Sequence, residues 1–232
     1  MEEHCHDFIG WECKGDFLTS GPEHDRLVTE FGEILKKYSL QGYHCTRLTE
    51  EEINNIRNKG LTLQNRETLC ERINKLQKAK LISKEEAMCL LANNQSGDRN
   101  RANMLWFCFF PPREAGENGI ERFFRYWGGE ALYNSHEDDP GTGERLKEVG
   151  IPCVVEAMVP LKSMPDSRLP DRQFIRAYLK EKGYRLFNGL DFEGYIIEDL
   201  DSTNIIDIHQ FPNDAFTELT GCAKWDYPLT NH

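Results

Sequence analysis

The chain has 232 residues, with 39 acidic against 28 basic side chains and a formal net charge of −11. A general nucleic-acid-binding protein normally carries a basic face, so this balance argues against that class. No apolar run approaches the ~18 residues that would cross a bilayer, and the acidic first residues do not resemble a secretory signal. We therefore expect a cytoplasmic protein without membrane contact, long enough for one domain with a sizeable core.

The first forty residues predict an arm followed by a helix. After Ser20-Gly21-Pro22, apolar side chains recur at helical spacing, at Leu27, Phe31, Ile34 and Leu35. Further upstream, His4-Cys5-His6 and Cys13 have metal-ligand residue types, but their spacing matches no common zinc pattern. We expect no metal here, and we expect residues 1–40 to pack as an arm and helix on the core.

Two capping boxes mark helix starts in the next part of the chain. Thr49 stands three residues before Glu52, and Ser83 three residues before Glu86. The patterns predict a strand over 42–47 and helices over 49–60, 66–79 and after 83. Basic side chains concentrate here, at Arg57, Lys59, Arg66, Arg72, Lys75, Lys78, Lys80 and Lys84. A solvated helix face is the ordinary explanation, and contact with a phosphate backbone is the alternative.

The second half alternates strands and helices after a polar loop over 92–103. The patterns predict strands over 104–110, 130–133, 153–159, 193–198 and 204–210, and helices over 121–127, 138–149 and 171–182. Because the order is not a strict βαβ repeat, we expect an α+β fold. One catalytic domain would span residues 41–220, and a C-terminal tail would span residues 221–232.

Three short motifs on separate strands carry the residues of chemical interest. His44-Cys45-Thr46-Arg47 ends a strand and is followed by a helix and Gly60-Leu61. Leu105-Trp106-Phe107 lies in an aromatic strand, and Glu193-Gly194-Tyr195-Ile196-Ile197 opens a strand with a glutamate. A histidine, an aromatic residue and a glutamate on three separated strands, in this order, are the groups that a cavity for cleaving NAD needs.

In this order, over roughly residues 40–210, the motifs resemble those of ADP-ribosyltransferases of the diphtheria-toxin and poly(ADP-ribose) polymerase type. The resemblance implies an ADP-ribosyltransferase-like split β-sheet, mixed or antiparallel, with flanking helices. It implies NAD as substrate, no metal, and transfer of ADP-ribose to a macromolecular acceptor, either a protein or RNA or DNA. A mono-ADP-ribosyltransferase similar to a bacterial toxin or defence effector, held in check by an inhibitory protein partner, is the setting that the resemblance suggests.

The resemblance also assigns roles around the ribose and nicotinamide. Glu193 would stabilise the oxocarbenium-like transition state of nicotinamide release, and His44 would hold the other ribose. Thr46 would contact the nicotinamide amide, beside Cys45, which stands where glycine is common and narrows the space. Trp106 replaces the family's tyrosine and would stack on the nicotinamide ring, although a place in the core explains it equally well.

Arginines and one aspartate complete the expected site. Arg47, Arg99 and Arg101 would meet the pyrophosphate, because guanidinium forks match phosphate oxygens. Asp191 lies two residues before Glu193 and would face the acceptor. Three alternatives to the transferase remain open at this point: NAD hydrolysis, removal of an RNA 2′-phosphate, and a non-catalytic interaction domain.

Overall fold

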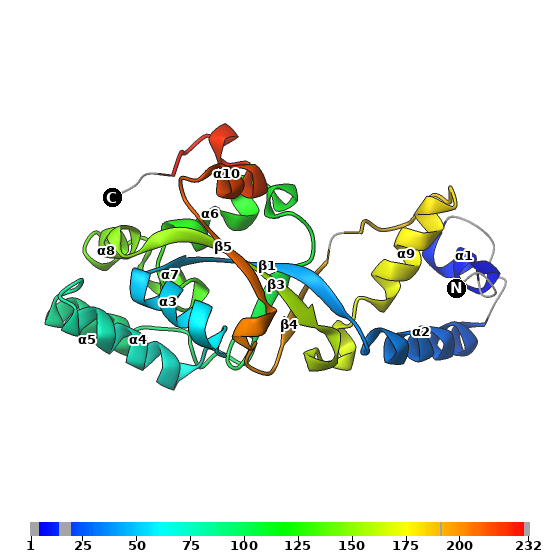
Figure 1. The fold of residues 1–232 in the computed structure, drawn as a ribbon, viewed down its shortest axis with the longest axis horizontal. Helices are drawn as coiled ribbons and strands as arrows, with labels where there is room; N and C mark the ends of the chain where they lie inside the picture. The colour runs from blue at the N-terminus through cyan, green and yellow to red at the C-terminus, as the bar shows by residue number, and fades with distance from the viewer. Residues whose placement is uncertain (1–4, 14–19, 191, 230–232) are drawn as a thin grey trace.

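In the part of the chain that the structure describes, an antiparallel sheet of five strands forms the centre (Figure 1). The computed structural model describes residues 5–13, 20–190 and 192–229. Its strands are β1 (Ser39–Leu48), β2 (Leu105–Cys108), β3 (Ile151–Pro160), β4 (Glu193–Ile196) and β5 (Ile205–Gln210). They lie in the order β4-β2-β1-β3-β5, and every neighbouring pair is antiparallel. Together with the helices, this sheet confirms the α+β class.

The helices surround the sheet and extend beyond one end of it. Within the described residues they are α1 (Cys5–Glu12), α2 (Gly21–Leu35), α3 (Glu50–Lys59), α4 (Arg66–Lys78), α5 (Lys84–Ala92), α6 (Glu117–Arg125), α7 (Glu130–His136), α8 (Thr142–Glu148), α9 (Asp171–Glu181) and α10 (Asp214–Thr220). Both predicted capping boxes are present, so α3 and α5 begin where the sequence places them. None of the described helices is long and apolar enough to span a membrane.

One predicted strand is wrong. The segment over 130–133 is the first part of α7, where Ala131, Leu132 and Tyr133 are all buried. They pack in a cluster with Trp127 and Leu146, against α4, α5 and α8. A run of four residues is too short for its periodicity to distinguish helix from strand, and the packing of this cluster decides the outcome.

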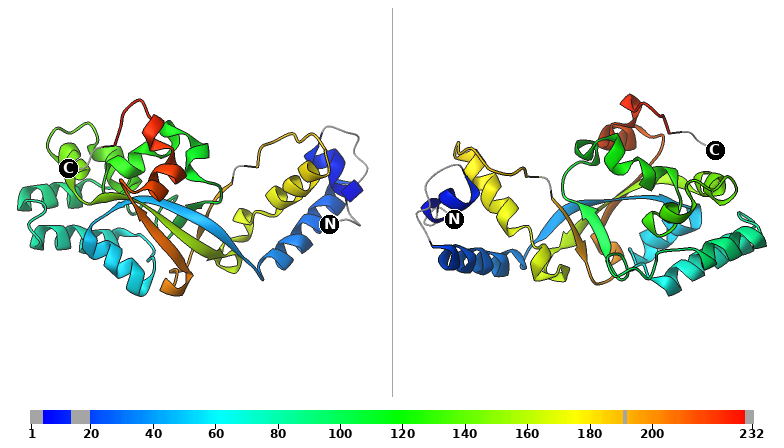
Figure 2. Two further views of the ribbon diagram at one scale, coloured as in Figure 1. Left: turned by 45° about the horizontal axis from the view of Figure 1, so that its top comes forward. Right: turned by 180° about the vertical axis from the view of Figure 1, so that it is seen from behind.

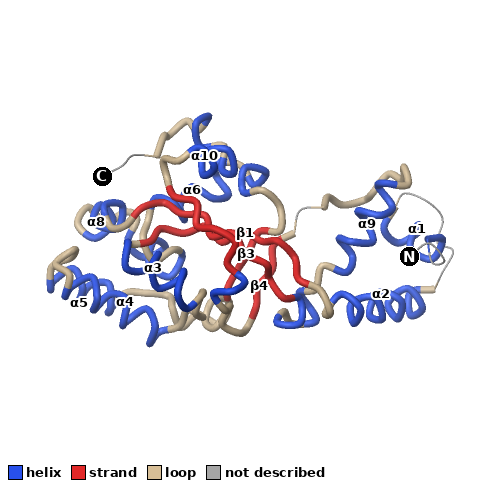
Figure 3. The backbone as a smooth tube through the Cα atoms, in the orientation of Figure 1, coloured by secondary structure: helices blue, strands red, loops and turns tan. Residues whose placement is uncertain are grey.

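Among the described residues, four hydrophobic clusters stabilise the arrangement. One lies on the sheet face that carries Leu48, Val155 and Ile196, and another lies on the opposite face beneath α6 and α10. A third fills the space between α4, α5, α7 and α8. The fourth joins α1 and α2 to α9, and Figures 2 and 3 show these three helices standing together beyond the end of the sheet. The N-terminal helices therefore pack mainly against α9, while Leu35 at the end of α2 joins the cluster on the sheet.

β4 and β5 are close in sequence but lie at opposite edges of the sheet. The connection between them crosses the sheet and pairs at Leu200 with Leu61, which follows α3. Leu61 N–H donates to Leu200 O at 2.9 Å, and Leu200 N–H donates to Leu61 O at 2.8 Å. Both side chains are buried. This crossing fixes the segment after α3 against the rest of the fold.

Gly60 is required at this crossing, and its replacement provides a test. Its φ is +87°, and a Cβ added there would lie 1.8 Å from the carbonyl oxygen of Leu200. Gly60→Ala is expected to lower the free energy of unfolding by about 3–4 kcal/mol, because the backbone of the crossing has to move. Urea denaturation measures this change.

Gly183 gives a matched control. Its φ is +88°, but a Cβ there would meet nothing within 4 Å. Gly183→Ala therefore carries only the backbone strain and should cost about 1 kcal/mol. Equal losses in the two variants would mean that the contact with Leu200 does not constrain the fold.

Candidate functional site

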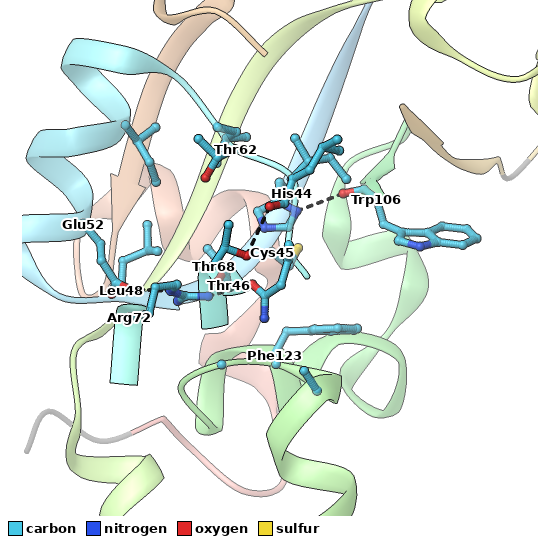
Figure 4. A pocket seen from close by; sticks show the side chains of 18 of the residues that line it. His44, Cys45, Thr46, Leu48, Glu52, Thr62, Thr68, Arg72, Trp106 and Phe123 are labelled. Atoms are coloured by element: carbon cyan, nitrogen blue, oxygen red, sulfur yellow. Dashed lines mark hydrogen bonds and ion pairs between the residues drawn. The ribbon is translucent and has the colours of Figure 1, made fainter. Parts of the chain in front are cut away.

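The candidate site lies where two neighbouring strands separate. β1 pairs with β3 along its whole length, from Ser39 to Leu48. With β2, by contrast, β1 shares a single register pair among the described residues, Tyr43 with Cys108. A cavity of about 1260 Å³ lies at this separation and is bordered by β1, β2, the segment from α3 to α4, and α6. Figure 4 shows it from close by.

The side chain of His44 links β1 to β2 beside their register pair, Tyr43 and Cys108. Its Nδ1 lies 2.9 Å from the carbonyl oxygen of Trp106, and its ring centroid lies 5.9 Å from that of Phe107. Burial lowers the pKa of the imidazole, and the positive charge of Arg72 lowers it further. The ring is therefore neutral at pH 7. Nδ1–H donates to the carbonyl, which leaves Nε2 as a hydrogen-bond acceptor for a ligand.

The indole of Trp106 lies on the other side of the sheet from the His44 ring. Side chains alternate between the two faces along a strand. The register pair places Tyr43 and Cys108 on one face of the sheet. Trp106 shares this face, whereas His44 lies on the other. The Trp106 ring packs against Tyr195, with centroids 4.7 Å apart, and Arg168 lies 5.5 Å above it. In Figure 4 the indole extends away from the His44 ring.

Glu193 is the first residue of β4 and is exposed. It pairs with Cys108 and so shares the face of Trp106. The hydrogen bond with Cys108 and burial are the main causes that raise the pKa of the Cys45 thiol, and the negative charge of Glu193 adds to them. Glu193 also borders a second cavity of about 590 Å³, beside Arg168 and Asp171. It therefore stands where the two cavities meet.

The structure brings some of the predicted residues together and separates others. His44, Cys45, Thr46, Arg101, Trp106 and Glu193 all border the larger cavity. They reach it from both faces of the sheet, because the cavity passes between β1 and β2. Arg101 is held by Glu130, with Nε 2.9 Å from Oε2. Asp191, the predicted acceptor-side residue, lies outside the described residues.

Two of the predicted phosphate ligands do not border this cavity. Arg47 is 3% exposed, and its guanidinium donates to Val149 O at 2.7 Å and Phe124 O at 3.0 Å. Alternation along β1 sends Arg47 to the face opposite Thr46, where it binds the ends of α6 and α8. Burial lowers its pKa to about 10. Arg99 is exposed in the loop before β2.

Two features of the cavity wall are not apparent from the motifs. Phe123 of α6 presents an aromatic ring to the cavity (Figure 4). Elsewhere on the wall, the carboxylate of Glu52 binds Arg72 and the indole N–H of Trp127. The capping box identifies Glu52 as a helix-start residue, but no sequence signal indicates its two distant partners.

Comparison with models of known protein families, with curated proteins and with solved structures finds no significant match to this chain.

Proposed function

We propose that the protein is a mono-ADP-ribosyltransferase that cleaves NAD at the nicotinamide–ribose bond and transfers ADP-ribose to a macromolecule. The observation that carries the proposal is the cavity at the β1–β2 separation, which His44, Thr46 and Glu193 border together. Its volume of about 1260 Å³ exceeds the roughly 300–1,000 Å³ usual for small-molecule pockets, so it has room for a dinucleotide. The split antiparallel sheet around it agrees with an ADP-ribosyltransferase-like fold.

The residues supply the interactions that this reaction needs. Loss of nicotinamide leaves positive charge on the ribose, as in glycoside hydrolysis, and a nearby carboxylate stabilises it. Glu193 offers that carboxylate at the cavity wall. The neutral Nε2 of His44 accepts a hydrogen bond from a ribose hydroxyl. Because the Trp106 ring is engaged with Tyr195, Phe123 is the better placed ring to lie against the nicotinamide.

The position of Glu193 also suggests how an acceptor approaches. The donor fills the larger cavity, and the second cavity opens on the other side of the same carboxylate. An acceptor entering there would reach the ribose carbon without displacing NAD. Asp25, Asp171 and Arg168 border this entrance. Its mixed charge is compatible with a protein or a nucleic-acid acceptor.

Glu193→Gln tests the assignment of the catalytic carboxylate. The residue is exposed at the start of an edge strand, so the variant should fold normally. Loss of one electrostatic partner in the transition state is expected to slow nicotinamide release roughly 10²–10³-fold. The assay incubates labelled NAD with cell extract and separates free nicotinamide from the labelled acceptor, which is then digested with protease or nuclease.

Glu198→Gln is the matched control for this assay. Glu198 follows β4 on the same segment and binds Ser163 at 3.0 Å, but it does not border either cavity. The control should cleave NAD at the wild-type rate. Undiminished NAD cleavage by Glu193→Gln would exclude Glu193 as the catalytic carboxylate. Label released only as free ADP-ribose would indicate a hydrolase in place of a transferase.

His44→Ala is expected to weaken NAD binding as well as turnover, because the variant loses the acceptor nitrogen. The pH dependence follows from the lowered pKa of the ring. The affinity for NAD should be constant from pH 8 down to a pH below the pKa of an ordinary histidine. It should fall only when further acidification protonates Nε2 and so removes the hydrogen-bond acceptor. Calorimetric titration of Glu193→Gln with NAD at several pH values measures this. Affinity that increases on acidification would contradict the neutral form.

A further inference from the structure

Arg72 is fixed at the wall of the larger cavity by contacts on three sides. Its Nε donates to Glu52 Oε1 at 2.7 Å, and its Nη1 donates to Gln64 Oε1 at 2.7 Å. The guanidinium lies 4.6 Å from the ring of Trp127. Its side chain retains 23% exposure. Since the contacts hold the group in one orientation, little conformational entropy remains to be lost when a ligand binds.

Most of the guanidinium's hydrogen-bonding capacity is unused. Arginine has five N–H donors, and two of them are taken by Glu52 and Gln64, so three have no protein partner within the described part of the chain. Arg72 borders the cavity, and its charge reaches His44, whose pKa it lowers. Figure 4 shows the two side chains on the same cavity. The free donors are therefore available to a ligand that also contacts His44.

The neighbouring carboxylate of Glu52 is ionised and pairs with the Nε side of the guanidinium. Glu52 accepts from the backbone N–H of Thr49 at 2.8 Å, from its hydroxyl at 3.1 Å and from Trp127 Nε1 at 2.9 Å, in addition to Arg72. Burial would raise the pKa of Glu52, but Arg72 and these donors outweigh it and lower the pKa. Glu52 is thus engaged by four donors and occupies the Nε side of the guanidinium, which leaves the remaining Nη donors free for a ligand.

We propose that Arg72 binds the phosphate oxygens of the ligand in this cavity, in the role that was expected of Arg47 and Arg99. A guanidinium with free parallel donors matches a phosphate or pyrophosphate group. The start of α4 does not provide an alternative, because its backbone N–H groups at Glu67 and Thr68 are already bound by Asn65. The identity of the ligand as NAD rests on the proposed function; the affinity of the site for a phosphoanion does not.

The test titrates wild-type protein, Arg72→Gln and Arg72→Lys with inorganic pyrophosphate, inorganic phosphate and ADP-ribose by calorimetry. ADP-ribose is expected to bind Arg72→Gln about 10- to 100-fold more weakly, as for loss of hydrogen bonds to a charged group. Arg72→Lys keeps the positive charge but loses the paired guanidinium donors, so its affinity for ADP-ribose should lie between those of the wild type and Arg72→Gln. The phosphate and pyrophosphate arms distinguish a free-anion site from one that requires the nucleotide.

Lys75→Gln is the matched control. Lys75 lies one turn further along α4, borders the same cavity and is paired with Glu51 at 3.1 Å. Lys75→Gln removes the same unit of charge as Arg72→Gln. An equal loss of affinity in both variants would show that the general positive potential of the wall attracts the anion, and it would overturn the proposal. If Arg72→Gln does not fold, nuclear magnetic resonance of the arginine Nε–H signals in the wild-type protein decides. The Arg72 signal is expected to shift when pyrophosphate is added, and an unchanged signal would overturn the proposal.

The two proposals can fail separately. If the wild-type protein releases nicotinamide from NAD while Arg72→Gln and Arg72→Lys bind ADP-ribose as tightly as the wild type, the Arg72 assignment is wrong and the transferase stands. If the wild-type protein does not cleave NAD but binds pyrophosphate through Arg72, the phosphoanion site stands and the transferase does not.

Discussion

The early end of the pairing between β1 and β2 is the constraint on which the candidate site depends. β1 pairs with β3 along its whole length, while β2 pairs with β4 along its whole length, so the two halves of the sheet diverge after Tyr43 and Cys108. A continuous sheet would bury the backbone of both strands and leave no space between them. The separation instead opens a cavity to which both faces contribute, and it explains how His44 and Glu193 can border one space from opposite faces.

A single carboxylate joins the walls of this cavity. Glu52 lies in the first turn of α3, binds Arg72 of α4 and accepts a hydrogen bond from the indole N–H of Trp127, in the turn before α7. Three segments that are separate in sequence therefore meet at one largely buried charge. Removing one partner from a buried charged network typically costs several kcal/mol, because the remaining charge is left without compensation. The same network that stabilises the wall also orients the guanidinium toward the cavity, so stability and ligand binding share these residues.

The sequence predicts the local features of this structure better than its long-range ones. The capping boxes at Thr49 and Ser83 and the strand at His44 depend on neighbouring residues and are found as expected. The helical state of 130–133 depends on packing against Trp127 and Leu146, which no local pattern encodes. The directions of Arg47 and Trp106 follow from strand register, and register is known only when the partner strand is known. The order and approximate position of the motifs were accessible from sequence, but the face that each side chain occupies was not.

The order of the strands also bears on how the chain folds. β1, near the N-terminus, occupies the centre of the sheet, yet its partner β3 follows more than a hundred residues later, and the edge strands β4 and β5 come last. Such non-local pairing slows folding, because a long chain segment must be closed before the contacts form. During synthesis both edges of β1 would remain unpaired until β2 and β3 emerge, and unpaired strand edges promote aggregation. The helices α4 and α5, which are neighbours in sequence and pack on each other, are then the part of the chain best able to form before the sheet is complete.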